Sequence, residues 1–197
     1  MAMRNSVRSP CPRPAKTAHH LREDEAARLS SAGAQALPCL TIENMEPVSF
    51  NPAQQHRLEA LLQIVFESRG QAFDPAGRQA DIRNIAEIYQ RDGGDFWVLM
   101  SGDTLIATIA LKIIDRAAGI GEIKRYFVLP DLQGQGIGAQ LMDHAIAAAR
   151  ARQLRTLRLD TMKSAHAALS IFRKKGFYEI EKYNANEVAE IFMEKTL

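Results

Sequence analysis

The sequence predicts a single α/β domain with a mixed, mostly antiparallel central sheet of about six to seven strands, flanked by about four helices. Two successive hairpins between residues 96 and 128 indicate antiparallel pairing in one part of the sheet. The strands and helices that alternate after residue 122 favour a mixed sheet. A chain of 197 residues, 46% of them hydrophobic, is long enough to bury the core of one such domain.

The first 36 residues differ in composition from the rest. Positions 1 to 22 hold five of the 25 basic residues and none of the 23 acidic residues, and they include three prolines, Pro10, Pro12 and Pro14. We therefore expect residues 1–36 to be a disordered or dispensable extension, or an overlong translation start, and residues 37–197 to form the domain. A mitochondrial-type targeting segment is also basic and acid-poor, but prolines disfavour its amphipathic helix.

The expected domain begins with a strand and two amphipathic helices. Residues 38–45 alternate enough to form a strand. Asn51 can cap a helix with Pro52 at its first position, and apolar residues recur at helical spacing until Gly70. A second helix, with apolar positions from Ile82 to Tyr89, ends at two consecutive glycines.

The remaining elements follow from alternation and turn residues. A turn at residues 101–104 joins the first two strands, and a second turn at 117–119 leads to the third. The later helices and strands are separated by short polar segments. The expected strands are 96–100, 105–111, 122–128, 156–160, 177–183 and 189–195, and the expected helices are 140–152 and 165–175.

A glycine-rich run is the most informative motif of the chain. It reads Gln133-Gly134-Gln135-Gly136-Ile137-Gly138-Ala139 and lies between an expected strand and an expected helix. Glycines allow positive φ and a close approach of the backbone, while the free N–H groups and positive dipole end of a helix attract anions. The run therefore predicts a site for a diphosphate. It is not a P-loop, because no Lys-Ser or Lys-Thr pair follows the glycines.

A dinucleotide-binding turn is the main alternative. The pattern G-x-G-x-x-A matches at Gly134, Gly136 and Ala139, and Asp160 follows 21 residues later. In a Rossmann turn the first glycine normally follows the strand directly, whereas residues 129–133 intervene here. The antiparallel hairpins upstream also disagree with the Rossmann order.

Three motifs resemble the GNAT superfamily of N-acetyltransferases. Gln133, Gly136 and Gly138 match the acyl-CoA signature [QR]-x-x-G-x-[GA], and Leu157 to Thr161 resembles the family's fifth strand. Residues 172–177, Phe-Arg-Lys-Lys-Gly-Phe, resemble the closing [YF]-x-x-x-G-F motif. The resemblance covers roughly residues 38–197. It implies a GNAT-type fold in which two parallel strands splay apart at the acyl-CoA site.

The resemblance also implies a co-substrate, acetyl-CoA, and residues that bind it. The pantetheine arm would pair with backbone groups of Phe127, Val128 and Leu129, and the diphosphate would lie on the main-chain amides of the glycine run. The residues expected to bind acetyl-CoA are Phe127, Val128, Leu129, Gln133, Gly134, Gln135, Gly136, Ile137, Gly138, Ala139 and Phe172. The activity implied is acetyl transfer to a primary amine by direct attack in a ternary complex.

Glu122 is the candidate general base. An amine must lose a proton before it attacks a thioester, and in some members of the family a glutamate six residues before the end of this strand accepts that proton. Regular alternation would place Glu122, Lys124 and Tyr126 on one face of the strand and Arg125 and Phe127 on the other. A structural role for Glu122, in a pair with Lys124 or Arg125, is the competing interpretation.

The sequence differs from the family pattern at the position of the tyrosine that commonly protonates the leaving thiolate. Phe172 occupies that position, and phenylalanine has no proton to donate. Water could protonate the thiolate, since a thiol of pKa about 8.5 is a tolerable leaving group. Tyr126 or Tyr178 could instead donate from another element. The departure leaves a non-catalytic CoA-binding or sensor protein of the same fold as an alternative function, with an NAD-type dinucleotide-binding protein less favoured.

The composition of the chain disfavours several classes of binding partner. Outside residues 1–22 the chain carries a net charge of −3, which disfavours nucleic-acid binding, and no apolar stretch is long enough to span a membrane. His166, Cys39 and the pair His19-His20 lack metal-ligand spacing, so we expect no metal. The two cysteines do not form a disulfide framework, so a cytoplasmic location is expected. The expected partner is a small-molecule or peptide amine, entering between residues 51–91 and residues 178–190; a homodimer is left open.

Overall fold

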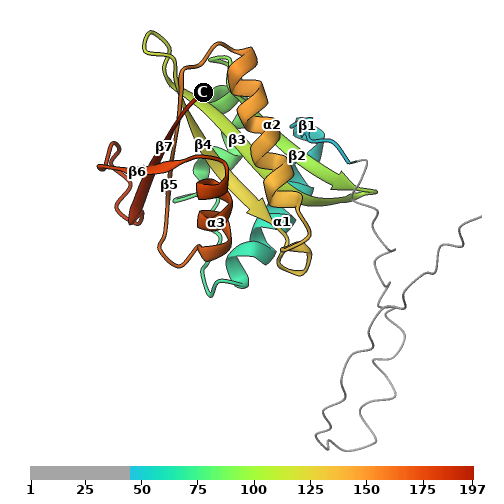
Figure 1. Cartoon of the computed structure of the whole chain (residues 1–197). Helices are drawn as coiled ribbons and strands as arrows, with labels where there is room; N and C mark the ends of the chain where they lie inside the picture. Colours follow the sequence, from blue (N-terminus) through green and yellow to red (C-terminus); the bar gives the residue numbers. More distant parts are fainter. Residues whose placement is uncertain (1–44) are drawn as a thin grey trace, which may run out of the picture. The chain divides into compact units, whose positions relative to one another are not determined.

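The computed structural model describes residues 45–197, which form a seven-stranded sheet with helices on both faces (Figure 1). The strand expected at residues 38–45 and the extension expected at residues 1–36 lie outside the described part of the chain. The sheet has the order β1-β2-β3-β4-β5-β7-β6. Its strands are β1 (Val48–Ser49), β2 (Asp95–Ser101), β3 (Thr104–Asp115), β4 (Ile120–Val128), β5 (Thr156–Thr161), β6 (Tyr178–Ile180) and β7 (Ile191–Thr196).

The sheet combines antiparallel and parallel strand pairs, as the sequence predicts. Strands β1 to β4 pair antiparallel in chain order, whereas β4 and β5 are parallel. Strand β7 pairs antiparallel with both β5 and β6, so the last strand of the chain is inserted between two earlier ones. The structure therefore confirms a mixed, mostly antiparallel sheet.

The helical elements also follow the expected order. The α-helices are α1 (Gln55–Glu67), α2 (Ile137–Ala151) and α3 (His166–Lys174), and the short helices are η2 (Pro52–Gln54), η3 (Ala80–Asn84), η4 (Ala86–Gln90) and η5 (Pro130–Leu132). Asn51 caps η2, accepting a hydrogen bond from the amide of Ala53. The second amphipathic helix of the prediction is instead two short pieces, the 3-10 helix η3 and the π-helix η4. Ile82, Ile85 and Tyr89 are nevertheless buried as their spacing predicts.

Two hydrophobic clusters lie on opposite faces of the sheet. Helices α2 and α3 pack on one face, the α2 face, through residues such as Leu141, Met142 and Phe172. Helix α1 and the short helices η3 and η4 cover the other, the α1 face, through residues such as Leu58 and Ile82. Alternate residues of β2 supply each cluster, with Trp97 and Leu99 on the α2 face. Within residues 45–197 no helix is long and apolar enough to cross a membrane.

Candidate active site

The parallel pair β4–β5 separates midway along β4. The pairing runs from Ile120 with Thr156 to Ile123 with Leu159 and stops there. Strand β4 continues for five residues, to Val128, beyond this last pair. This stretch, residues 124–128, has no strand beside it on the β5 side and is called the open edge of β4 below. The splayed parallel strands expected from the family resemblance are present.

A β-bulge at Arg125 lies at the start of the open edge. Thr108 pairs with Phe127 but Ala110 pairs with Lys124, so Arg125 and Tyr126 together oppose a single residue of β3. Arg125 has φ 49°, in the left-handed region that non-glycine residues rarely adopt. The predicted alternation is therefore wrong beyond Lys124. Tyr126 packs against the α2-face cluster and Phe127 against the α1-face cluster, because one extra residue reverses all later side chains.

The glycine run forms the turn that leads into α2. Gly134 and Gly136 have φ 80° and 89°, and Gly136 is the N-cap of the helix. No side chain caps this helix end. Among residues 45–197, none of the backbone N–H groups from Gly134 to Ala139 has a hydrogen-bond acceptor. Six consecutive free amides and the positive end of the α2 dipole make a cradle for an anion.

Gly138 permits a close approach between α2 and β4. A Cβ atom added at Gly138 would lie 2.4 Å from the hydroxyl oxygen of Tyr126 and 3.1 Å from Ile171. The Tyr126 ring also packs against Phe172, with ring centroids 5.4 Å apart. The Tyr126 hydroxyl is buried and has no hydrogen-bond partner among the described residues. Burial raises the pKa of Tyr126 above its usual value, so the phenol keeps its proton.

The other residues expected to contact acetyl-CoA surround this cradle. The Val128 side chain lies in the α2-face cluster, and the Gln133 side-chain amide donates to the Val128 carbonyl at 3.3 Å. The Leu129 amide donates back to β3, at Ile106, so it is not free. Gln135 and Gly134 are exposed, whereas Ile137 is buried and anchors the first turn of α2. The open edge of β4 and the six free amides are thus joined in the chain by residues 129–133, which include the short helix η5.

Glu122 lies in a polar cluster on the α1 face, at the last paired residues of β4. Its Oε1 atom accepts hydrogen bonds from the Tyr183 hydroxyl at 2.7 Å and the Asn184 amide at 3.1 Å, and Lys124 Nζ lies 3.3 Å away. No described residue donates to its other oxygen, Oε2. Only 7% of the Glu122 side chain is exposed. The carboxylate is thus anchored through one oxygen and retains the other as an acceptor.

Asp160 completes the polar cluster from β5. Lys124 donates to its Oδ2 atom at 2.9 Å, so this ion pair spans the point where the two strands separate. Asn184 and Asn186 also donate to Asp160. The sequence pattern singles out Asp160 only as the acidic residue that follows the dinucleotide pattern G-x-G-x-x-A by 21 residues. The parallel pairing of β4 with β5, together with alternation along β5, was the signal that could have placed it beside Lys124.

The two tyrosines expected as alternative proton donors lie apart from Glu122. Tyr126 is on the opposite face of the sheet. Tyr178 is half exposed on β6 and its hydroxyl donates to Glu194 at 2.9 Å. Tyr183 is the tyrosine that contacts Glu122, and burial together with the Glu122 charge raises its pKa. The clustered phenol therefore stays protonated and serves as a donor to Glu122.

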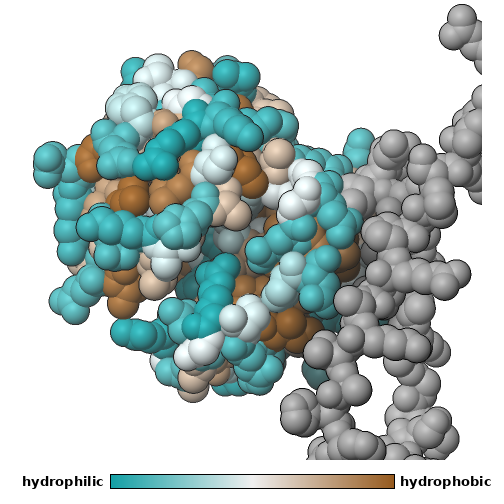
Figure 2. Space-filling model, turned by 60° about the horizontal axis from the view of Figure 1, so that its bottom comes forward, coloured by the Kyte–Doolittle hydropathy of each residue, from teal (hydrophilic) through white to brown (hydrophobic). Residues whose placement is uncertain are grey.

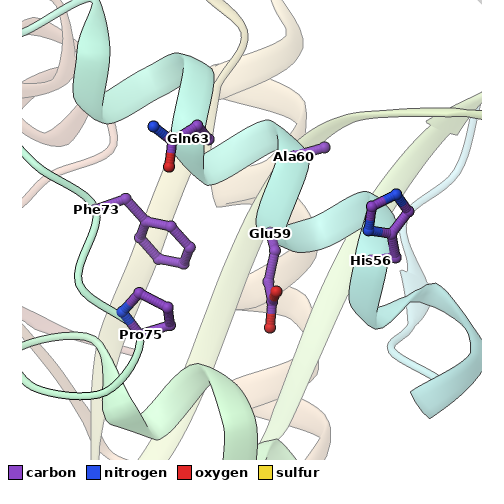
Figure 3. A pocket seen from close by; sticks show the side chains of 6 residues that line it. All are labelled: His56, Glu59, Ala60, Gln63, Phe73 and Pro75. Atoms are coloured by element: carbon purple, nitrogen blue, oxygen red, sulfur yellow. The ribbon is translucent and has the colours of Figure 1, made fainter.

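The surface of the molecule is hollowed at the end that carries the open edge of β4. Figure 2 shows this end, with hydrophilic and hydrophobic residues around the hollow. A separate shallow depression of about 310 Å³ lies on the outer side of α1, where Phe73 and Pro75 face Glu59 and Gln63 (Figure 3). That depression is lined by none of the candidate site residues. Within residues 45–197 no group of three or more His, Cys, Asp or Glu side chains is arranged to hold a metal.

Comparison with known proteins identifies the family. The model of the acetyltransferase (GNAT) family matches residues 58–177. An IAA acetyltransferase of Azospirillum brasilense is 33% identical over 104 residues, which cover 52% of this chain and 67% of that protein. A GNAT acetyltransferase structure from Staphylococcus aureus Mu50 superposes with a TM-score of 0.70 at 22% identity, over 77% of this chain and 98% of that one. The PaiA N-acetyltransferase of Thermoplasma acidophilum, solved with coenzyme A, gives 0.61 at 18% identity, over 78% and 99%. This chain belongs to the GNAT acetyltransferase family.

Proposed function

We propose that this acetyltransferase uses acetyl-CoA and transfers the acetyl group to the primary amine of a small molecule or peptide. The observation that carries the proposal is the open edge of β4 together with the six free amides from Gly134 to Ala139, which follow it in the chain after the short helix η5. An extended arm can pair with the edge while its diphosphate lies on the amides. The coenzyme A bound to the structurally similar Thermoplasma protein supports this ligand.

Glu122 is the proposed general base. The amine arrives on the α1 face at the point where β4 and β5 separate, and its proton passes to Glu122, directly or through one water. The amine nitrogen then attacks the thioester carbonyl, the new C–N bond forms and the C–S bond breaks. Tyr183, Asn184 and Lys124 hold Oε1 of Glu122, so Oε2 is the atom proposed to take the proton. Both substrates are present together, so no acetylated enzyme is required.

The α1 face, where we place the acceptor amine, carries both acidic and basic side chains near the separation of β4 and β5. Glu122 and Asp160 attract an ammonium group, although Lys124 partly neutralises them. Arg69 lies over the Phe127 ring at 5.2 Å, and no carboxylate within residues 45–197 pairs with it. Burial lowers the pKa of this guanidinium, which remains charged. These charges support acceptors that combine a primary amine with a polar or anionic group.

We propose that water protonates the leaving CoA thiolate. Tyr126→Phe and Tyr178→Phe are each expected to leave kcat within about threefold. Burial raises the pKa of Tyr126, the Tyr178 hydroxyl already donates to Glu194, and a thiol is a tolerable leaving group. Tyr126→Phe should also raise the free energy of unfolding by about 1 kcal/mol, since it removes a buried hydroxyl that has no partner. Steady-state kinetics and denaturant unfolding check both results. A tenfold or larger fall in kcat would identify the altered tyrosine as the proton donor.

Thiol release from acetyl-CoA tests the proposed function. The protein is mixed with acetyl-CoA and with separate pools of amino acids, polyamines, aminoglycosides and short peptides, and free thiol is measured against a control without acceptor. We expect turnover with at least one amine class. Calorimetry with acetyl-CoA, CoA and NAD runs in parallel. Tight CoA binding without thiol release in any pool would favour a CoA-binding sensor, and binding of NAD alone would overturn the proposal.

A further inference from the structure

A mostly buried ion pair ties the β-bulge at Arg125 to the helices of the α1 face. The guanidinium of Arg125 donates through Nε to Asp81 Oδ2 at 2.7 Å and through Nη2 to Asp81 Oδ1. The two side chains are only 19% and 16% exposed. Tyr89 in η4 donates its hydroxyl to the same carboxylate. The three residues are called the Asp81 clamp below, and none of them was a candidate in the sequence analysis.

We propose that Asp81 is a positioning residue that holds the bulge at Arg125 and thereby shapes the open edge of β4 for acetyl-CoA. The inference rests on the proposed function, since the edge is assigned there to the co-substrate. Asp81 itself lies in η3, which packs on the α1 face, and does not belong to the glycine run. It therefore acts on the strand edge through Arg125.

The bulge is strained and needs such support. A non-glycine residue in the left-handed region is unfavourable, and it persists only where the surrounding contacts fix it. Two groups fix Arg125. The Asp81 clamp holds its side chain, and the fully buried Thr108 donates its hydroxyl to the Arg125 carbonyl at 2.7 Å. Arg125 and Gln153 are the two non-glycine residues with positive φ in the described chain, and Gln153 lies at the end of α2, away from the site.

The bulge determines which side chains of β4 point toward the α1 face and which toward the α2 face. With the bulge in place Tyr126 lies beneath Gly138, and Phe127 packs edge-on against Phe66 of α1 with ring centroids 5.7 Å apart. Without it, regular alternation would exchange the faces of Tyr126 and Phe127. The backbone groups offered along residues 124–128 would shift with them. The clamp therefore links the helices on the acceptor side to the strand edge that binds the co-substrate.

Asp81→Asn tests the inference. The substitution keeps the size of the side chain but removes the charge that pairs with Arg125. We expect the Kd for acetyl-CoA, measured by calorimetry, to rise at least tenfold, and amide hydrogen exchange of residues 120–129 to accelerate. The matched control is Asp95→Asn, because Asp95 is 15% exposed and also holds an arginine and several polar groups, at the start of β2. The control should lower stability without changing either quantity.

A rescue variant separates positioning from simple loss of stability. In the double variant Asp81→Asn with Arg125→Gly, glycine adopts the positive φ without strain and no unpaired guanidinium remains. The Kd for acetyl-CoA should return to within about threefold of the wild-type value. Unchanged affinity and exchange in Asp81→Asn, or no recovery in the double variant, would overturn the inference. A wild-type protein that fails to bind acetyl-CoA would refute the proposed function instead, while the exchange measurement would still report on the clamp.

Discussion

Gly136→Asp should abolish the binding of acetyl-CoA without unfolding the domain. The added carboxylate would stand among the six free amides at the start of α2, where it would occupy the anion cradle and repel a diphosphate. An added Cβ atom at Gly136 meets nothing within 4 Å, so the side chain does not disrupt packing. The positive φ of 89° adds strain, which aspartate tolerates better than most residues. Calorimetry should show the Kd rise by at least 100-fold.

Gly102→Asp is the control for this variant. Gly102 also has a positive φ, 55°, and also opens onto free space, but it lies in the β2–β3 turn. It therefore introduces the same charge and similar backbone strain outside the glycine run. Circular dichroism and thermal unfolding should show both variants folded, with acetyl-CoA affinity lost in Gly136→Asp alone. Equal loss in both variants would mean that stability, and not the cradle, explains the effect.

Glu122→Gln should lower kcat by about 10- to 1000-fold while acetyl-CoA affinity stays within about threefold, because it removes the proposed general base and leaves the glycine run intact. The glutamine oxygen can still accept the hydrogen bonds of Tyr183 and Asn184, so the polar cluster should persist. Steady-state kinetics measure kcat, and calorimetry with acetyl-CoA measures the affinity that should be retained.

Glu194→Gln provides the comparison for Glu122. Glu194 is also partly buried and holds Arg158 and Tyr178, one strand further from the separation point. Its removal should loosen the C-terminal strands but leave kcat within about threefold. If the two variants reduce kcat equally, Glu122 has a structural role and the attack uses another base or none.

The parts of the fold that the sequence predicts are those set by local patterns. Turn residues and two-residue alternation place the hairpins of β2, β3 and β4, and glycines mark the start of α2. The side chains after Lys124 are predicted on the wrong faces because a bulge depends on how many residues each paired strand supplies. Nothing local marks Arg125 as the extra residue. Its partner Asp81 is 44 residues away in the chain.

The contacts of the polar cluster around Glu122 likewise cannot be predicted from local sequence patterns. Glu122 could be selected by its position on the strand, but its partners Tyr183 and Asn184 follow 61 and 62 residues later. They reach Glu122 because the segment between β6 and β7 returns to the sheet, and strand order is a long-range property. The free Tyr126 hydroxyl beneath Gly138 likewise depends on the packing of α2 over the bulged strand.

The insertion of β7 between β5 and β6 determines when the site can exist during synthesis. Domains generally fold as units during synthesis. Met193 of β7 is fully buried in the α2-face cluster, so this core stays incomplete until the last strand has emerged from the ribosome. Tyr183 and Asn184 reach Glu122 only once β7, which follows their segment, lies between β5 and β6. A nascent chain that stops short of Ile191 is therefore expected to lack both the folded α2-face core and the polar cluster around Glu122.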